Sequence, residues 1–394
     1  MNDQPTLQDV LCSGYEALAR KRRLPAEARF AAARMMACRT PALGGHRHYC
    51  PAGHFETCSY NSCGHRACPQ CAFLRMASWL ERQQARLLAC PHTHIIFTIP
   101  EELNELWLAN RRTMAELLFK AVRDTVRQLL SDRVYLGATP GIIAALHTWG
   151  SSLVLHPHIH CLVTCGGLTD AGEWQKPVKS CLLPAPVVKS LFRGKYLAFL
   201  RAALDRQQLR PPPGRSAAQT RSLLNRLGRR KWNVRVEAPY DHAGGVVNYL
   251  ARYLRGGPIS NHRILAFDGE TVQFRVKDYR RSGDSGPVRR RVLTLAIEEF
   301  LRRVLMHVPV PRMHLVRYYG LYARNCTERL NTARERLGQQ PYTTQPPLSV
   351  DDLLLRFGPS ERTHGPHCHR ALVARVIPPV SRAPPSHIGI APAA

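Results

Sequence analysis

The amino-acid sequence predicts an α+β fold in which helices flank an antiparallel sheet. Apolar residues recur at helical spacing in four segments, at residues 6–37, 73–90, 101–131 and 293–306. Short apolar runs bounded by turn signals predict strands at residues 92–100, 141–149 and 155–163. A hairpin-like turn joins the second run to the third, so these two strands are expected to run antiparallel. A block crowded with cysteine and histidine precedes the strands and predicts a separate N-terminal module.

The third of these strands has an alternating pattern. Histidine occupies every second position of an apolar run, at His156, His158 and His160. Alternate side chains of a strand point to one face, so the three imidazoles would form a row while the other face meets the core. The residues expected on the core face are Leu155, Ile159, Cys161 and Val163. The row predicts a metal site, and the alternative is a core strand with stray surface histidines. Pro157 cannot donate to a ladder, so regular pairing is expected to begin at His158.

A second pattern lies further along the chain, at residues 246–254. Val246, Leu250 and Leu254 repeat at helical spacing, with glycines before them and Gly-Gly-Pro after them as helix boundaries. Tyr249 and Tyr253 are one helical turn apart and lie on the same side of this helix. Alone, two such phenols are typical of amphipathic packing. Beside a histidine metal site they predict a pair of nucleophiles.

These residues carry a resemblance to a known family. Two histidines around one hydrophobic residue, followed downstream by Tyr-x-x-x-Tyr on a helix, resemble the HUH endonucleases with two tyrosines. The chain is more closely similar to the rolling-circle transposases of the insertion-sequence ninety-one family. The stretches that carry this similarity are Cys38 to Cys71, His94 to Pro100, His147 to Gly150, Tyr249 to Tyr253 with Ile259 to Asn261, and Phe274 to Asp278. The resemblance implies a HUH nuclease core, an antiparallel sheet with flanking helices.

The resemblance also implies a reaction. A catalytic Mg²⁺ or Mn²⁺ would be held by His158 and His160, with His94 as the candidate third ligand; a satisfied core histidine is the alternative for His94. Tyr249 and Tyr253 would attack a metal-polarised phosphodiester, leaving a free 3′-OH and a 5′-phosphotyrosine. Arg252 lies between the tyrosines and is expected to stabilise the phenolate or to bind phosphate. The expected substrate is single-stranded DNA or extruded hairpin DNA.

The cysteine block predicts structural zinc, as one or two ions. Thiolates and imidazoles at knuckle spacing are zinc ligands. The candidate ligands are Cys38, His46, Cys50, His54, Cys63, Cys68 and Cys71. The family usually carries Cys-x-x-Cys where this chain has Cys50 to His54, so either His54 or Cys58 is expected to supply the last ligand. The segment from His364 to His369 resembles a terminal zinc knuckle reduced to one cysteine, and no functional site is expected there.

The charge of the chain points to a polyanionic partner. Its formal net charge is +28 over 394 residues, a balance that favours nucleic acid because binding releases counterions. The residues expected to contact DNA are Arg66, Arg252, Lys277 and Arg280. No long apolar segment and no signal-peptide pattern is present in the sequence, so a membrane partner is not expected. We expect a cytoplasmic, nucleoid-associated protein whose crowded cysteines bind metal rather than form disulfides.

Six segments are predicted along the chain. They are N-terminal helices at 1–37, a zinc-binding module and linking helix at 38–90, the first part of the nuclease core at 91–180, a basic helical insertion at 181–230, the rest of the core with the tyrosine helix at 231–335, and a Pro-rich, partly disordered tail at 336–394. The insertion is interpreted as a DNA clamp, with a solvated helix pair as the alternative.

Two other functions compete with a transposase. A rolling-circle replication initiator or relaxase would share the metal site and the tyrosine pair, but the zinc block and the motifs after the tyrosines favour the transposase. A non-enzymatic zinc-finger DNA-binding protein would explain the charge and the cysteines, yet it leaves the histidine strand and the tyrosine pair unexplained.

Overall fold

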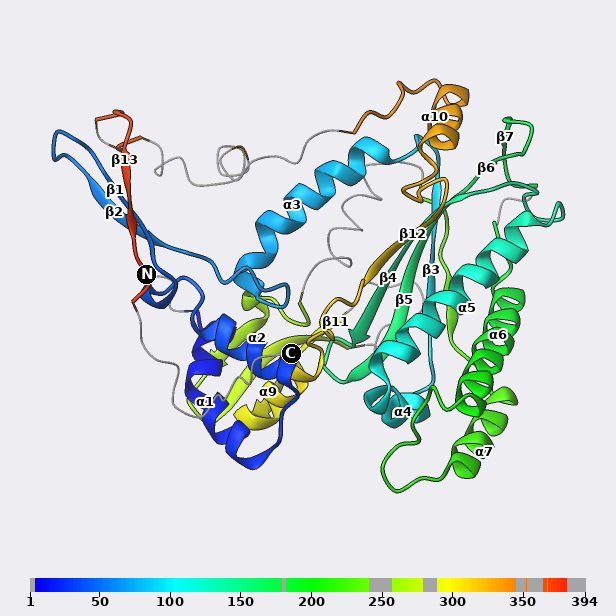
Figure 1. The fold of residues 1–394 in the computed structure, drawn as a ribbon, viewed down its shortest axis with the longest axis horizontal. Coiled ribbons are helices and arrows are strands. Elements are labelled where there is room, and N and C mark those ends of the chain that lie inside the picture. Colours follow the sequence, from blue (N-terminus) through cyan, green and yellow to red (C-terminus); the bar gives the residue numbers. More distant parts are fainter. Residues whose placement is uncertain are drawn as a thin grey trace. The chain divides into compact units, whose positions relative to one another are not determined.

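The computed structural model describes residues 4–178, 182–240, 257–278, 289–344, 352, 364–366 and 368–380, with the backbone alone at 72–75 (Figure 1). The described residues belong to two compact units. One unit draws on Met1–Ser78, Ile259–Val308 and Leu348–Ala394, and the other on Trp79–Pro258 and Pro309–Pro347. None of the described helices has both the length and the apolar composition needed to cross a membrane.

The second unit is built on a five-stranded antiparallel sheet. Its strand order is β12-β4-β5-β3-β8. The strands are β3 (His92–Thr98), β4 (Gly141–Trp149), β5 (Leu155–Thr164), β8 (Val234–Val236) and β12 (Val316–Gly320), and β6 (Gly167–Leu168) pairs separately with β7 (Trp174–Gln175). The three predicted strands are therefore confirmed, and the predicted α+β class with them. The histidine strand β5 is central, with β4 on one side and β3 on the other.

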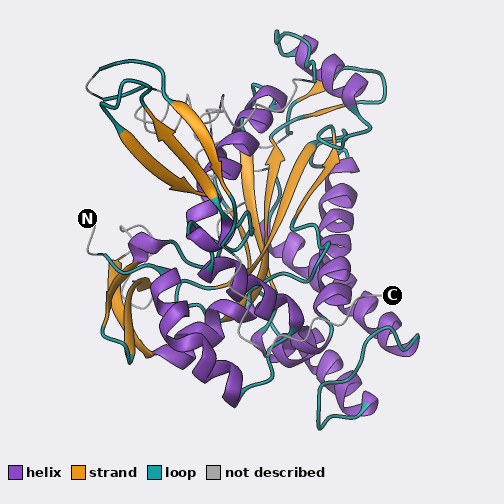
Figure 2. Ribbon diagram, turned by 60° about the vertical axis from the view of Figure 1, so that its left-hand side comes forward, coloured by secondary structure: helices purple, strands orange, loops and turns teal. Residues whose placement is uncertain are grey.

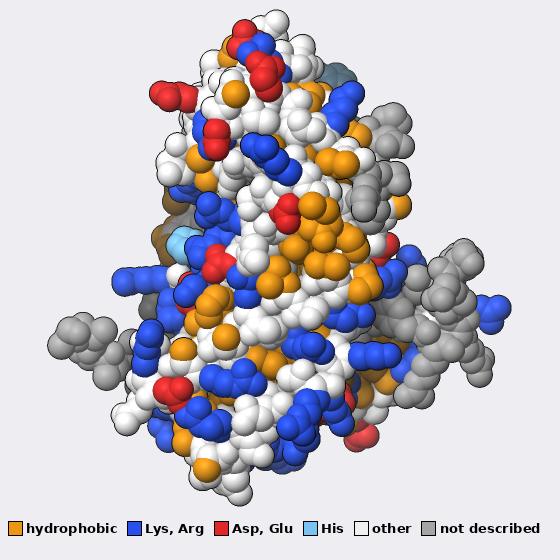
Figure 3. All heavy atoms as spheres, turned by 90° about the vertical axis from the view of Figure 1, so that its right-hand side faces the viewer, with side chains coloured by type: hydrophobic (Ala, Val, Ile, Leu, Met, Phe, Trp, Pro, Cys, Tyr) orange, Lys and Arg blue, Asp and Glu red, His pale blue; other side chains and the backbone are white. Residues whose placement is uncertain are grey.

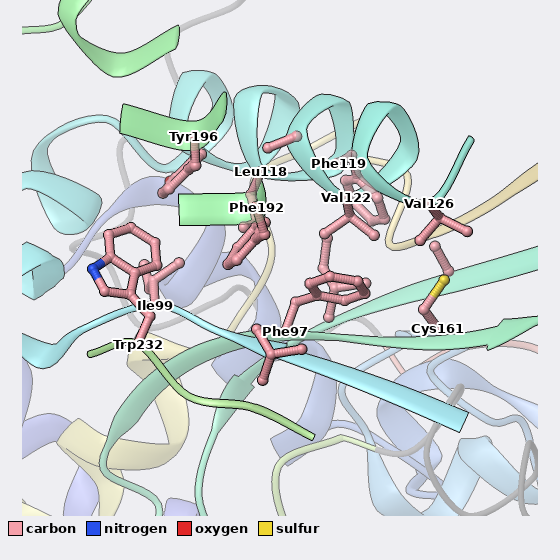
Figure 4. Close-up of a cluster of buried hydrophobic side chains, with 14 of the residues drawn as sticks. Phe97, Ile99, Leu118, Phe119, Val122, Val126, Cys161, Phe192, Tyr196 and Trp232 are labelled. Carbon is pink, nitrogen blue, oxygen red and sulfur yellow. The ribbon is translucent and has the colours of Figure 1, made fainter. Parts of the chain in front are cut away.

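Two long helices cover one face of this sheet. They are α5 (Arg111–Ser131) and α6 (Ala185–Asp205), and the shorter helices of this region are η2 (Glu101–Leu103), α4 (Asn104–Ala109) and α7 (Ala217–Gly228). Phe97 of β3 packs edge-on against Phe192 of α6, at 5.0 Å between ring centroids (Figure 4). Cys161 and Ile159 of β5 are fully buried in the same core, as the alternation predicted.

The predicted insertion at 181–230 therefore contributes to the core. Val188, Phe192, Tyr196 and Leu200 recur every four residues along α6, and all four are fully buried. A helix with such a stripe is stabilised by burial of its apolar face, so α6 is part of the core of this unit and not a solvated helix. Its interpretation as a DNA clamp stays a prediction. The basic residues of α6 are partly exposed to solvent. Asp205 is the one acidic residue between positions 185 and 230, so this segment is strongly basic.

The opposite face of the sheet packs against the C-terminal part of α3 (Pro69–Arg86) and against α10 (Thr327–Arg336). The predicted helix at 73–90 begins and ends four residues earlier than expected. Tyr322 is the buried centre of this layer: its hydroxyl accepts from the Leu88 backbone N–H at 3.1 Å and donates to His92 Nε2 at 2.8 Å. The Nδ1–H of His92 donates to the Cys90 carbonyl at 2.8 Å.

Gly141 permits this arrangement, and a substitution tests it. A Cβ at position 141 would lie 2.7 Å from the Tyr322 ring. We expect Gly141→Ala to lower the free energy of unfolding by about 2 kcal/mol, because the overpacked ring is buried and hydrogen-bonded. Gly194 lies exposed on α6 with nothing within 4 Å of such a Cβ, so Gly194→Ala is the matched control and should stabilise by up to about 1 kcal/mol. Denaturant unfolding of both variants measures the difference; equal stability would contradict the packing described.

The first unit contains a helical bundle and a three-stranded sheet. The helices are α1 (Leu7–Lys21), α2 (Ala26–Met36) and α9 (Ile297–Met306), and the sheet has the order β11-β10-β9, formed by Arg289–Ala296, Thr271–Asp278 and Ile264–Phe267. Short 3-10 turns lie at Pro41–Leu43 (η1) and Asn261–Arg263 (η3). The helix predicted at 293–306 begins only at Ile297, because the preceding residues pair with β10.

The bundle also changes the predicted division of the chain. α9 packs on α1, where Ile297 lies so close to Gly14 that a Cβ there would be 2.4 Å from its side chain. Residues 259–308 therefore join the N-terminal helices rather than the five-stranded sheet, and the predicted segment 231–335 is split between the two units. Local sequence patterns could not reveal this packing, because the faces that meet are far apart in the chain: Lys21 of α1 forms an ion pair with Glu298 of α9, 277 positions away.

A second three-stranded sheet of this unit contains residues from both ends of the chain. Its order is β13-β1-β2, formed by Val373–Ile377, Gly45–Tyr49 and Glu56–Tyr60 (Figure 2). β1 is the middle strand, with Tyr49 opposite Val373 on one side and Glu56 on the other. Part of the Pro-rich tail is therefore an ordered strand of the cysteine-rich module.

Candidate functional site

The histidines of β5 lie at the middle of the sheet, on the face opposite the α5–α6 core. The register places His158 opposite His147 of β4 and opposite Thr98 of β3. His147, His158 and His160 are all buried, with exposed fractions of 6%, 8% and 7%. Their ligand nitrogens lie within 4.8 Å of one another, and no carboxylate belongs to this group among the described residues.

A hydrogen bond fixes which nitrogen of His158 carries the lone pair, and a second one involves His160. The Nδ1–H of His158 donates to the His156 carbonyl at 2.6 Å, which leaves the lone pair on Nε2. Nδ1 of His160 lies 2.9 Å from Nε2 of His94. If that Nδ1 is the donor, Nε2 of His160 also carries a lone pair, and it faces Nε2 of His158 at 3.0 Å. Two lone pairs so close repel each other unless a proton or a cation lies between them.

Burial keeps these imidazoles neutral. Desolvation lowers the pKa of His158 to about 4. It also lowers the pKa of His94 to about 3, with help from the positive charge of Arg235. The pKa of His147 is well below its ordinary value for the same reason, which is burial. Neutral rings are the form that binds metal, so His147 and His158 are in the form that a metal ion requires at neutral pH.

The predicted third ligand and the observed third histidine differ. His94 was the candidate, but it is outside the group of ligand nitrogens and contacts it through His160. His147 takes the third place, stacked on Trp149 at 4.8 Å between ring centroids. The sequence indicated His147 only as part of a motif, because its position beside His158 depends on the register between β4 and β5. His156, the remaining histidine of the row, is exposed.

The predicted nucleophiles lie outside the described residues. Tyr249, Arg252 and Tyr253 fall within 241–256, and Arg280 falls within 279–288. The described chain leads to the first of these segments from the edge of the sheet. Tyr240 pairs with His92, its N–H donating to the His92 carbonyl at 2.9 Å. Tyr240, the last described residue before the tyrosine segment, therefore lies beside β3, the strand that carries His94.

Four cysteines form a separate metal-ligand group. Cys38, Cys63, Cys68 and Cys71 are buried and lie within 4.8 Å of one another. The Sγ atoms of Cys38 and Cys63 both lie 3.5 Å from that of Cys71. Tetrahedral Zn²⁺ with Zn–S bonds of about 2.3 Å holds sulfurs about 3.8 Å apart, so the four thiols fit one zinc ion. Backbone N–H groups of Cys63 and His65 donate to the sulfurs at 3.4 Å, as suits thiolates.

The other predicted zinc ligands are placed elsewhere. His46 does not belong to the four-cysteine group. It lies on β1, where it pairs with Ser59 of β2 on one side and Val376 of β13 on the other. Cys58 is exposed. Cys50 and His54 meet each other but not the four-cysteine group. Of the predicted ligands, Cys63, Cys68 and Cys71 are thus brought together, and Cys38 completes the four-cysteine group.

Comparisons with known proteins bear on both sites. A family described as "Putative transposase" matches residues 141–329, and "Transposase zinc-binding domain" matches residues 10–99. The chain is 35% identical to "Putative transposase y4qJ" of Sinorhizobium fredii, over 84% of this chain and 85% of the relative. It is 31% identical to "Transposase for insertion sequence element IS801" of Pseudomonas savastanoi pv. phaseolicola, over 77% of this chain and 72% of the relative. No solved structure matches.

The chain belongs to the IS91 family of transposases. It is accordingly a transposase, an enzyme that acts on DNA. The matched zinc-binding domain of this IS91-family transposase spans the four-cysteine group, and the transposase match spans β4 and β5 with their histidines.

Two of the predicted DNA-contacting residues can be placed in the transposase. Arg66 is exposed in the loop between Cys63 and Cys68. Lys277 is exposed on β10 and lies opposite Arg290 of β11. In the other unit, Figure 3 views the side of α6 and α7 and shows Lys and Arg gathered over its lower half with few acidic residues among them.

The zinc assignment predicts a loss of metal on substitution. We expect Cys68→Ser to remove about one zinc ion per chain and to lower the soluble yield, because a closed four-thiolate site contributes folding energy directly. Metal analysis of the purified protein measures the zinc content. Cys58→Ser, an exposed cysteine of the same module, is the control and should keep both properties. Full zinc occupancy and normal folding in Cys68→Ser would refute the assignment.

Proposed function

We propose that this transposase nicks single-stranded DNA at the ends of its mobile element and transfers the strand by a rolling-circle-like route. The observation that carries the proposal is the buried histidine pair, His158 and His160, whose Nε2 atoms face each other at 3.0 Å. Cis ligands of an octahedral ion with bonds of about 2.1 Å are separated by about 3.0 Å, so the pair fits Mg²⁺ or Mn²⁺. Zinc in the four-cysteine group is structural by this account.

The residues of the cation site have distinct roles. His147, His158 and His160 would hold the ion, and His94 would orient the His160 ring through its hydrogen bond. Bound there, the cation supplies Lewis-acid polarisation of the scissile phosphodiester. His156 would contribute its backbone carbonyl, which sets the tautomer of His158, and its ring lies 5.0 Å from the His158 ring between centroids.

The covalent step belongs to the tyrosines. The phenolate oxygen of Tyr249 or Tyr253 attacks phosphorus, the P–O3′ bond breaks, and the 3′ oxygen leaves with a proton as a free 3′-OH. The 5′-phosphotyrosine conserves the energy of the broken bond, so a new 3′-OH can reverse the reaction on another strand without a nucleotide cofactor. A phenol has a pKa of about 10 in water, and Arg252 would help by stabilising the phenolate or holding the phosphate.

Charge supports the choice of substrate. The net charge of +28 supplies affinity for a phosphate backbone without sequence information. A metal ion held within a sheet face must act on one backbone at a time, which favours single-stranded or hairpin DNA over a paired duplex. By this proposal the transposase works on DNA in the cytoplasm, at the nucleoid.

The test is a covalent-adduct assay. Labelled single-stranded oligonucleotides from the element ends are incubated with the transposase and Mg²⁺ or Mn²⁺, and the products are separated on a denaturing gel. We expect a labelled protein band that a chelator prevents. A non-enzymatic DNA-binding protein would shift the oligonucleotide on a native gel and give no such band. Equal reaction with element ends and with unrelated single strands would contradict the proposed recognition of the element ends.

The role of His94 predicts a metal-dependent defect. We expect His94→Ala to cleave about 10–100-fold more slowly at limiting Mn²⁺ and to recover at high Mn²⁺, since a residue that orients a ligand tunes metal affinity. Titration of Mn²⁺ in the adduct assay measures this. A defect that is the same at every Mn²⁺ concentration would instead make His94 a packing residue.

A further inference from the structure

A second group of zinc-type ligands lies at the end of the β13-β1-β2 sheet. It consists of Cys50, His54 and Cys368, whose ligand atoms lie within 4.8 Å of one another. Cys50 and Cys368 are 318 positions apart in the chain, yet their Sγ atoms are 3.7 Å apart. Nδ1 of His54 lies 4.0 Å from the Cys50 sulfur.

Local backbone structure brings Cys50 and His54 together. Cys50 follows the last residue of β1, and its N–H donates to the Phe55 carbonyl at 2.8 Å. Within this loop the Gly53 N–H donates to the Cys50 carbonyl at 2.9 Å. Gly53 has φ of +75°, a conformation that side chains rarely adopt. The result is a tight turn that presents a thiol and an imidazole on one side.

The third ligand comes from the turn before β13. The register of β1 with β13 places Tyr49 opposite Val373, so the residues after β1 meet the residues before β13. A turn closed by the Gly365 N–H, which donates to the Arg370 carbonyl at 2.9 Å, folds Cys368 back toward Cys50. Gly365 makes room for it: a Cβ there would lie 2.7 Å from the Cys368 sulfur.

We propose that Cys50, His54 and Cys368 bind a second structural Zn²⁺, which fastens the C-terminal strand to the N-terminal cysteine module. The Sγ–Sγ distance of 3.7 Å matches the separation of about 3.8 Å in tetrahedral zinc thiolates and is far longer than a disulfide bond of about 2.05 Å. Two thiolates and one imidazole leave one position of the tetrahedron, which a water molecule, His364 or His369 fills.

This proposal departs from our expectation for the terminal segment. No site was predicted there because the segment contains one cysteine and the other candidate ligands are distant in the sequence. The structure supplies the missing ligands from the other end of the chain. The two sites share no ligand, so the second ion adds to the four-cysteine zinc and does not replace it.

Zinc stoichiometry of the full chain tests the proposal. We expect two zinc ions per wild-type chain and one in Cys368→Ser, measured by elemental analysis after removal of free metal. Cys58→Ser removes an exposed thiol outside both groups and should keep two ions. Cys368→His offers a nitrogen ligand at the same position and should restore the second ion. One ion in the wild type, or two in Cys368→Ser, would overturn the proposal.

A second measurement reports the fastening itself. Hydrogen exchange of the backbone N–H groups of β13 and β1 should be slow in the wild type and should rise in Cys368→Ser, while exchange in α5 and β5 of the other unit stays unchanged. A variant that folds poorly would raise exchange in every element, which separates a folding failure from loss of one ion. Unchanged exchange in β13 together with loss of one zinc would show that the ion does not fasten the strand.

Discussion

Replacing His160 with alanine is expected to abolish strand cleavage while leaving the affinity for single-stranded DNA nearly unchanged. His160 is buried, faces His158 and is oriented by His94. Its loss removes a ligand from the cation site, and Lewis-acid stabilisation of a phosphoryl transition state amounts to several kcal/mol, or about 10³-fold in rate or more. Affinity should persist because it arises from the +28 net charge, which one neutral imidazole does not alter.

The adduct assay and a binding titration at fixed salt measure the two quantities. His158→Ala should behave like His160→Ala, and His147→Ala should show a comparable loss if it is the third ligand. The matched control is His156→Ala, because this side chain lies on the same strand but is exposed and stands outside the ligand group. Cleavage at the wild-type rate in His158→Ala or His160→Ala would refute the cation site.

The second large effect concerns the two tyrosines. If Tyr249 and Tyr253 act in sequence, Tyr249→Phe and Tyr253→Phe should each abolish complete transposition, because strand transfer needs a second cleavage while the first end is still held. At least one single variant should still nick DNA and form an adduct through the remaining phenol. The double variant should form none, since removal of both hydroxyls leaves no nucleophile.

An excision or mating-out count measures transposition, and a denaturing gel of the adduct measures nicking. Circular dichroism of each variant checks that Phe has not disturbed the fold. A single variant that transposes like the wild type would leave one catalytic tyrosine. The other would then be a packing residue at the border of the apolar stripe of its helix.

The sequence predicted three strands of the five-stranded sheet correctly because their signals are local. Alternation in β5, the Gly141 to Trp149 run and the proline after β3 each depend on neighbouring residues. His147 was not predicted to join the histidine group because its position depends on the pairing of β4 with β5, and a slip of one residue would turn it to the other face.

The remaining errors have the same physical origin. Cys368 meets Cys50 from 318 positions away, so its neighbours in the sequence did not indicate this contact. The strand before α9 was predicted as helix because its pairing with β10 is not encoded in its own residues alone. The segment that contains α6 was predicted as a basic insertion from its charge, whereas its apolar repeat of four residues indicates a helix that packs on the core. The charged residues in the composition of such a helix indicate only its solvent-facing side. Whether its apolar side is buried depends on the sheet that it covers.

The pairing of β1 with β13 has a consequence for biosynthesis. Hairpin β1–β2 can form as soon as residue 60 leaves the ribosome, but the free edge of β1 has no partner until residues 373–377 emerge. Domains begin to fold during synthesis, and an unpaired strand edge in the meantime is a template for wrong pairing. The nascent transposase thus holds an open edge through most of its translation, and a premature stop codon upstream of Val373 would leave that edge open permanently. Chaperone demand should therefore be greatest for truncated products of this gene.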